Sequence, residues 1–331
     1  MNANGSSTKM IVLSLGMALT MSTATQARCA LVSKEVTFYF GIETPVPDAN
    51  HPITIDRFHT DLEVSFRATG WDVVVSYDGP EYGGTGLYVP PEEALLYGNA
   101  DSRWILSSIP ADFGFIGARP NEPFWILPQN AISEALPLGV AAEHTGGASL
   151  CVWNPADPRG ADTLDRWIQL QLLEVRGPAD GHFAMWQADG VNPPVVFIST
   201  YDTGITDADV YSISAGSHVH VNWGFTQAGL YEVDFRISTV VQCDDWLNAD
   251  WAPRGDEFFN GDCVVDFQDF ALLGSRWLQP ADWGDPNTSA FIDPDNLVDL
   301  TDLATLSDQW LACGYPGCQT DSSAVDPNGV N

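Results

Sequence analysis

The sequence predicts a mainly β protein, in which an all-β sandwich domain precedes a small α-helical module of two loop–helix repeats. Two observations predict this division. Between residues 30 and 241, short β-branched or aromatic segments are separated by Gly, Pro, Asn and Asp, and no helical period of useful length occurs. After residue 256, a 12-residue acidic stretch occurs twice, and each copy precedes an apolar segment that ends in Trp-Leu.

The N-terminus has the pattern of a secretory signal peptide. Lys9 precedes the apolar run Met10–Met21, and small residues follow up to Ala27. This run is too short to span a bilayer, so residues 1–27 are expected to be cleaved after Ala27. We therefore expect an exported protein, extracellular or at the cell surface with the periplasm as an alternative, and without a membrane span.

The domain over residues 30–241 is expected to be a two-sheet sandwich, because one antiparallel sheet could not bury so many aromatic side chains. The expected strands are Lys34–Phe40, Asp61–Ala68, Trp71–Tyr77, Trp167–Val175, His182–Gln187, Val195–Ser199, Val219–Trp223 and Leu230–Ser238.

The rest of the chain divides into three parts. Residues 242–255 form a Trp-rich polar linker, residues 256–313 hold the two repeats, and residues 314–331 are a polar tail that we expect to be disordered. The six cysteines of an exported chain predict up to three disulfides, with fifteen connectivities. The preferred pair is Cys263 with Cys313, which would join the first loop to the end of the second helix.

The formal net charge of −31 excludes nucleic acids and anionic membranes as expected partners, because phosphate binding needs a basic patch. Lysine occurs only at Lys9 and Lys34. The acidic excess suits divalent cations, although a solvated surface adapted to salty surroundings explains most of it.

The doubled stretch has the spacing of a calcium loop. Phe258–Asp269 recurs 33 positions later as Phe291–Asp302. A 12-residue calcium loop takes its oxygens from positions 1, 3, 5, 7, 9 and 12. Position 1 is Phe in both copies, which removes one carboxylate and predicts weak binding. The expected ligands are Asn260, Asp262, Val264 (carbonyl), Asp266 and Asp269 in the first loop, and Asp293, Asp295, Leu297 (carbonyl), Asp299 and Asp302 in the second.

These repeats resemble the dockerin type I module, in a divergent form. The resemblance implies two EF-hand-like Ca²⁺ sites and a cohesin-like or other envelope protein as the partner of residues 256–313. The partner would contact the helices expected at Phe270–Leu278 and Leu303–Leu311. The alternative is a degenerate loop–helix pair without metal.

Histidines form the second candidate site. On a strand, His218 and His220 point to the same face, where two imidazoles can share one transition metal. With His59 and His182 they give a candidate Zn²⁺ or Cu²⁺ site. The alternatives are a hydrogen-bonded polar cluster at the edge of the sandwich, which we favour, and general acid–base catalysis.

Residues 34–240 resemble the choice-of-anchor M domain. The matching segments are Phe58-His59-Thr60-Asp61, Phe115-Ile-Gly-Ala with Pro123-Phe-Trp-Ile-Leu-Pro-Gln, Gly177-Pro178 with Gly181-His182-Phe183, and Gly216-Ser-His-Val-His-Val-Asn-Trp-Gly-Phe. The family's usual Gly before the first His is Phe58 here. The resemblance implies an exported surface protein, in some cases associated with metal uptake, and no known activity.

No catalytic residue is assigned, because the chain has no Gly-x-Ser-x-Gly elbow and no His-Glu-x-x-His motif. The preferred hypothesis is a non-catalytic recognition or structural domain tethered through a calcium-dependent module. One alternative is a protein that binds or degrades polysaccharide, with glycoside hydrolysis as the least improbable activity. It rests on the dockerin resemblance and on the aromatic residues Trp71, Tyr77, Tyr82 and Tyr88. A second alternative is an extracellular transition-metal-binding protein.

Overall fold

The structure is a computed structural model, and it describes most of the chain between residues 29 and 242. The described ranges there are 29–43, 51–67, 70–79, 86–132, 134–145, 150–153, 155 and 165–242. In the C-terminal third they are 270–271, 273–274, 278 and 300–308. The expected signal peptide and tail lie outside the described residues, and so does the expected linker apart from Gln242, which ends β16 (Gly229–Gln242). So do both calcium loops, except that the last three residues of the second loop, residues 300–302, belong to α2 (Leu300–Asp308).

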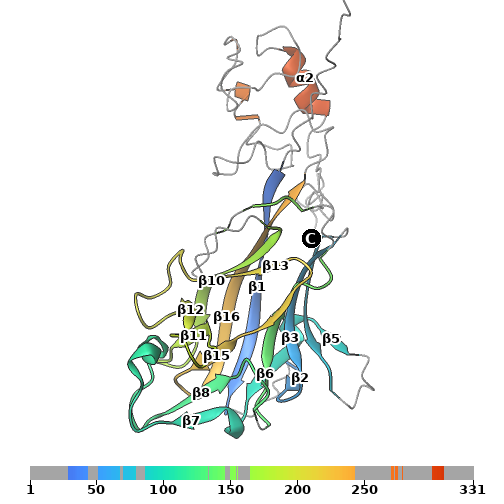
Figure 1. Cartoon of the computed structure of the whole chain (residues 1–331). Coiled ribbons are helices and arrows are strands. Elements are labelled where there is room, and N and C mark those ends of the chain that lie inside the picture. Colours follow the sequence, from blue (N-terminus) through green and yellow to red (C-terminus); the bar gives the residue numbers. More distant parts are fainter. Residues whose placement is uncertain are drawn as a thin grey trace, which may run out of the picture.

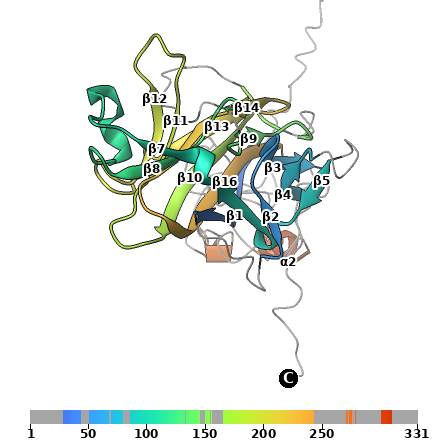
Figure 2. The same ribbon diagram turned by 90° about the horizontal axis from the view of Figure 1, so that it is seen from below.

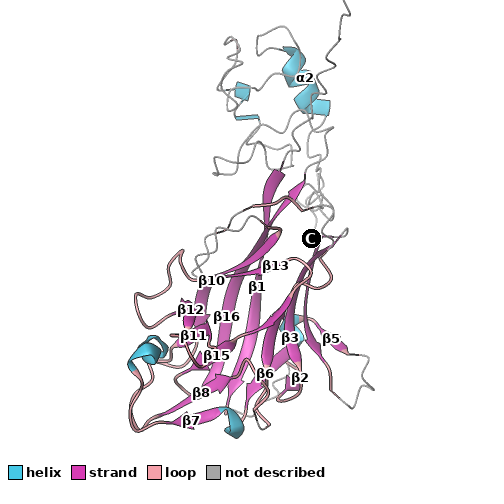
Figure 3. Ribbon diagram, viewed as in Figure 1, coloured by secondary structure: helices cyan, strands magenta, loops and turns pink. Residues whose placement is uncertain are grey.

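The described part is mainly β, as predicted, and its strands form three sheets (Figure 3). Sheet A has the order β13 (Val210–Ser214), β10 (Trp167–Arg176), β16 (Gly229–Gln242), β1 (Cys29–Ile42), β6 (Ala94–Gly98) and β2 (Ile53–Ile55). Sheet B has the order β14 (His218–His220), β9 (Leu138–Ala141), β3 (Thr60–Arg67), β4 (Gly70–Tyr77) and β5 (Leu87–Val89). Sheet C has the order β12 (Val195–Ser199), β11 (Phe183–Gln187), β15 (Asn222–Phe225), β8 (Pro123–Leu127) and β7 (Arg103–Ile105). The 3₁₀ helices are η2 (Pro91–Glu93), η3 (Ala100–Ser102) and η4 (Ala111–Ile116).

The expectation of two sheets was wrong, and a break in one expected strand gives the reason. Residues Val219–Trp223 do not form one strand, because β14 ends at His220 and β15 begins at Asn222. On one side of the buried Val221, β14 pairs with β9; on the other, β15 pairs with β8 and β11. The chain therefore passes from sheet B into sheet C at this residue. In the view of Figure 2, β14 and β9 lie between β11 and β12 on one side and β3 to β5 on the other.

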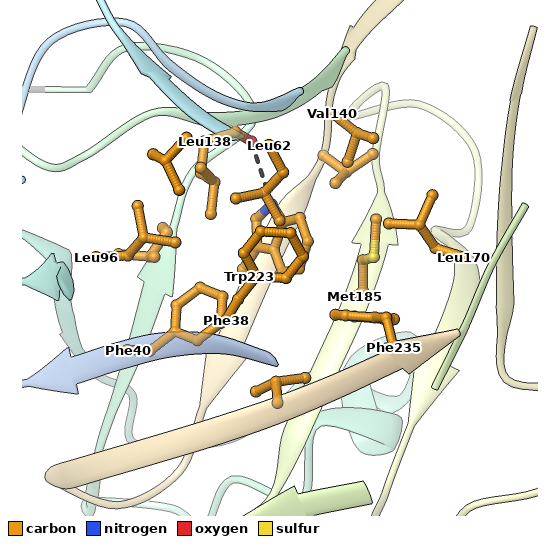
Figure 4. Close-up of a cluster of buried hydrophobic side chains, with 14 of the residues drawn as sticks. Phe38, Phe40, Leu62, Leu96, Leu138, Val140, Leu170, Met185, Trp223 and Phe235 are labelled. Atoms are coloured by element: carbon orange, nitrogen blue, oxygen red, sulfur yellow. Dashed lines mark hydrogen bonds between the residues drawn. The ribbon is translucent and has the colours of Figure 1, made fainter. Parts of the chain in front are cut away.

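One hydrophobic core joins all three sheets. Phe38 from β1 and Phe235 from β16 lie on one side of Trp223, and Leu62 and Leu138 of sheet B lie on the other (Figure 4). The indole Nε1 of Trp223 donates a hydrogen bond to the Leu138 carbonyl at 3.2 Å. Since Trp223 belongs to sheet C, this bond connects the two smaller sheets inside the core.

Sheet A is built on two 14-residue strands, β1 and β16, which pair along their whole length (Figure 1). The alternation in β16 puts Tyr231, Val233 and Phe235 into the core, while the intervening residues are less buried. This pattern is what the period of two of a half-buried strand requires. The side chains on the inner face of this long strand pair pack against those of the two smaller sheets.

The strand β3 is buried on both faces, and this feature positions the candidate site. Leu62 and Val64 point into the core. The alternate residues Asp61 and Glu63 belong to the opposite face, yet only 4% and 2% of their surfaces are exposed. Two buried carboxylates on one strand must each find a compensating partner, because the desolvation of a charge is costly.

A disulfide joins Cys29 at the start of β1 to Cys151. Beside it, Leu150 forms an isolated β-bridge with Val241 of β16. A disulfide of this kind is consistent with secretion, because oxidising compartments preserve such bonds. The preferred pair Cys263–Cys313 lies outside the described residues. In the part of the chain that the structure describes, no helix has the length and apolar character to cross a membrane.

Candidate metal centre

The candidate site lies on the face of sheet B that points away from the core. The strand β9 separates β3 from β14, and the pairing registers align Asp61, Gly139 and His220 in one row across the three strands. His218 lies in the adjacent row, opposite Ala141. The side chain of Asp61 therefore meets those of His218 and His220, although more than 150 residues separate Asp61 from this pair in the chain.

Three imidazoles surround the Asp61 carboxylate. The ring centroids of His59, His218 and His220 are 4.9–5.0 Å apart in all three pairs. Asp61 Oδ1 lies 2.9 Å from His218 Nε2 and 3.6 Å from His220 Nε2, and Asp61 Oδ2 lies 3.4 Å from His59 Nδ1. One ligand atom from each of the four residues lies within 4.8 Å of the other three.

These distances suit a single transition-metal ion. Zinc binds imidazole nitrogen and carboxylate oxygen at about 2.0–2.2 Å, so neighbouring ligands of a tetrahedral ion are about 3.3–3.5 Å apart. The measured nitrogen–oxygen distances of 2.9–3.6 Å bracket this value. The donor set of three imidazoles and one carboxylate is typical of zinc and is also suitable for copper.

Unsatisfied polar atoms give an independent reason to place a cation here. Asp61 Oδ1, His218 Nε2 and His220 Nδ1 are buried and make no hydrogen bond with any described residue, and the short contact between the first two lacks hydrogen-bond geometry. Buried polar atoms without a partner are rare, since each one costs about 1–3 kcal/mol. A metal ion bound by Asp61 Oδ1 and His218 Nε2 would give both of these atoms a partner.

The neighbouring carboxylate provides an internal comparison. Glu63 is as deeply buried as Asp61, but it accepts a hydrogen bond from the Ser65 hydroxyl and lies 3.4 Å from His144 Nδ1. The interpretation as a hydrogen-bonded polar cluster therefore fits Glu63. Asp61 differs from Glu63, because its Oδ1 lies 2.9 Å from His218 Nε2 and 3.6 Å from His220 Nε2 and accepts no hydrogen bond from a hydroxyl or a backbone amide of the described residues.

Gly139 makes room for the cluster. A Cβ atom at this position would collide with Asp61 Oδ1 and would lie 3.0 Å from His220 Cδ2 and 3.1 Å from His220 Nε2. Because Gly139 has no side chain, the Asp61 carboxylate and the His220 imidazole can approach each other across β9. This glycine is part of the site although it offers no ligand atom.

The electrostatics keep His220 available as a ligand. Burial lowers the pKa of His220 to about 4, and the nearby His59 and His218 act in the same direction. His220 is therefore neutral at physiological pH, which is the form that binds metal. Burial also raises the pKa of Asp61, against the opposing effect of His59 and His218. A cation in the cluster would outweigh the effect of burial, lower the pKa of Asp61 and hold its carboxylate ionised.

The backbone before His59 is in an uncommon conformation. Phe58 has φ +65°, in the left-handed region that favours glycine. The Phe58 ring is 40% exposed and lies under the Arg57 guanidinium at 5.8 Å. Strain of this kind is concentrated at functional sites, where the surrounding structure maintains it.

The structure brings together three of the four predicted histidines and adds Asp61. The ring of His182 packs against Tyr201 instead, at 4.9 Å between centroids, and is not in the cluster. The spacing of His59 and Asp61, two positions apart like His218 and His220, is the signal that could have identified the carboxylate. The ten predicted calcium ligands stay a prediction, because their side chains lie outside the described residues.

The expected sugar-stacking aromatics are mostly packed. Tyr77 is 7% exposed and belongs to the core, and Trp71 packs against Phe66. Tyr88 is 54% exposed, while Tyr82 lies outside the described residues. One exposed ring among three does not make an aromatic platform.

Comparisons with protein-family models, curated proteins and solved structures find no significant match to this chain.

Proposed function

We propose that this chain is an exported transition-metal-binding protein whose β domain holds one ion, preferably zinc, between His59, Asp61, His218 and His220. The observation that carries the proposal is the convergence of three imidazoles on a buried carboxylate whose Oδ1 makes no hydrogen bond with any described residue. Asp61 supplies the negative charge and the imidazoles supply neutral nitrogen donors. Gly139 provides the space in which the ligands approach each other.

The proposal retains a tethering role for residues 256–313. The duplicated acidic loops support two weak Ca²⁺ sites, and the resemblance to dockerin supports attachment to a cohesin-like or other envelope protein. In this hypothesis the β domain handles the transition metal and the C-terminal part determines where the protein is held. The non-catalytic character predicted from the sequence is part of the proposal, and polysaccharide binding is the alternative.

The test is metal binding by the full mature chain. After chelator treatment and dialysis, the protein is titrated with Zn²⁺ and Cu²⁺ in competition with a chromophoric chelator. We expect one equivalent of zinc per chain in the wild type. Asp61→Asn and His218→Ala should lose stoichiometric binding, because each removes a ligand from the sheet.

His182→Ala is the matched control, since this histidine lies outside the cluster. It should bind zinc like the wild type. The proposal is refuted if the folded wild type takes up neither metal at stoichiometric concentration. Retention of insoluble polysaccharide by the metal-free protein would favour the alternative.

A further inference from the structure

A pocket of about 480 Å³ adjoins the metal centre. Two of the proposed ligands, His59 and His220, form part of its wall, together with Arg57, Phe58 and Glu134. Small-molecule sites are concave and combine apolar lining with a few polar groups, and this pocket has both. A metal ion in the cluster would therefore lie beside an open volume.

The four ligands are not held equally. Asp61 lies in β3, and His218 and His220 lie in β14, so all three belong to hydrogen-bonded strands of sheet B. His59 precedes β3 and is outside any strand. Its side chain is 44% exposed, against 28% for His218, 17% for His220 and 6% for Asp61.

His59 also has a competing partner outside the cluster. Its Nδ1 atom lies 3.4 Å from Asp61 Oδ2 and 3.5 Å from Asp78 Oδ2, and the Asp78 side chain is 58% exposed. The same nitrogen cannot bind a metal and donate to Asp78 at the same time. The backbone of His59 is held, because its carbonyl accepts a hydrogen bond from the Asp78 amide at 3.0 Å. Release of the metal by His59 therefore requires only a side-chain rotation.

We propose that Asp61, His218 and His220 are the permanent ligands, and that His59 is exchangeable. When His59 turns toward Asp78, it opens a coordination position toward the pocket, where a small neutral nitrogen- or oxygen-donor molecule binds the metal. Three protein ligands with a fourth exchangeable position are a common arrangement for zinc sites that take external ligands. This inference rests on the proposed metal site.

The charges around the pocket favour a neutral ligand over an anion. The cationic group Arg57 is 3.3 Å from Asp56 and 3.8 Å from Glu134, so carboxylates already compensate it. The net charge of −31 on the chain further disfavours an anion. The exposed face of Phe58 offers apolar contact to the part of the ligand that does not bind the metal.

The experiment uses the full mature chain loaded with Co²⁺, whose visible spectrum reports coordination. His59→Ala should keep one equivalent of cobalt with an affinity about 10–100-fold lower, the range seen when metal sites lose one supporting contact. His220→Ala should lose stoichiometric binding. His182→Ala should match the wild type, and the melting of each variant by circular dichroism verifies its fold.

The second readout is the binding of imidazole at a pH at which imidazole is neutral. Imidazole should change the cobalt spectrum of His59→Ala saturably and at a lower concentration than in the wild type, and azide should act more weakly at equal concentration. The inference is overturned if His59→Ala loses cobalt as completely as His220→Ala, or if imidazole leaves its spectrum unchanged. Azide binding more tightly than imidazole would overturn the choice of a neutral ligand. If the wild type itself binds no cobalt and no zinc, the metal site fails, and this inference fails with it.

Discussion

Replacing Gly139 by alanine tests the architecture of the site without removing any ligand. Gly139 lies on β9 between Asp61 and His220, in the row that the three strands share. The new methyl group would collide with Asp61 Oδ1 and would press against the His220 ring at 3.0–3.1 Å. Real Cβ atoms essentially never come as close as this one would to Asp61 Oδ1, so the carboxylate must move, and the His220 ring must shift by a few tenths of an ångström.

The expected magnitude follows from the two consequences of that movement. Overpacking a filled site costs about 1–3 kcal/mol of stability. Displacing a metal ligand, even when it is retained in the chain, lowers metal affinity by about 10–100-fold or more, as loss of a supporting contact does. We therefore expect a folded variant with a modest loss of stability and a large loss of zinc affinity.

The assay combines a zinc competition titration with urea denaturation in the presence of EDTA. Gly224→Ala is the matched control, because its added methyl group would lie 2.7 Å from the Trp186 ring in sheet C and would meet none of the four ligands. It should lose stability but bind zinc like the wild type. If Gly139→Ala is folded and binds zinc as tightly as the wild type, the proposed packing of Asp61 against His220 is wrong.

Four further predictions concern strain, protonation, the disulfide and calcium. Phe58→Gly should leave the free energy of unfolding within about 1 kcal/mol of the wild type despite the loss of a ring, because it removes left-handed strain, whereas Phe58→Val should cost about 1–2 kcal/mol; urea denaturation measures both. The pKa of His220 is about 4 in the folded state and near 6.5 in the unfolded chain, so the unfolded chain binds more protons between these values. Stability in EDTA should therefore fall by at most about 3 kcal/mol as pH drops from 6.5 to 4, and His220→Gln should not show this loss. Replacing both Cys29 and Cys151 by serine should cost about 4–5 kcal/mol for a separation of 122 residues, and a calorimetric melt without a lower transition would contradict this. Millimolar Ca²⁺ should raise the melting temperature of residues 256–313 within the full chain relative to EDTA, and identical melts would exclude calcium binding there.

Strand prediction succeeded where β-branched or aromatic residues were concentrated between turn residues, with or without polar alternation. The expected Val195–Ser199 is β12 without change, and Trp167–Val175 differs from β10 by one residue. The strands that were missed, such as β6 and β9, are four- or five-residue apolar runs without a polar alternate position. Both are buried and pair in parallel with segments far away in the chain, so nothing local distinguishes them from other apolar segments.

The candidate site was predictable only in part, for the same reason. The shared face of His218 and His220 follows from their spacing, and His59 and His182 were included because both lie in segments expected to be β. Asp61 was not identified as a ligand, because its proximity to His220 depends on β9, which the pattern did not reveal. A β setting does not show which face of which sheet a residue reaches, and the tertiary structure places His182 beside Tyr201 instead.

For the proposed metal site, the alignment of Asp61, Gly139 and His220 across three strands would determine when metal can be captured. No two of these residues belong to the same hairpin, so the ligands meet only after distant parts of the chain have paired. An unfolded chain offers only local pairs such as His218 and His220, which without Asp61 and His59 make a much weaker chelating group. A chain that folds after export would thus be loaded with metal at its destination. The identity of the bound ion would then reflect the metals available in that compartment, and not those of the compartment in which the chain was synthesised.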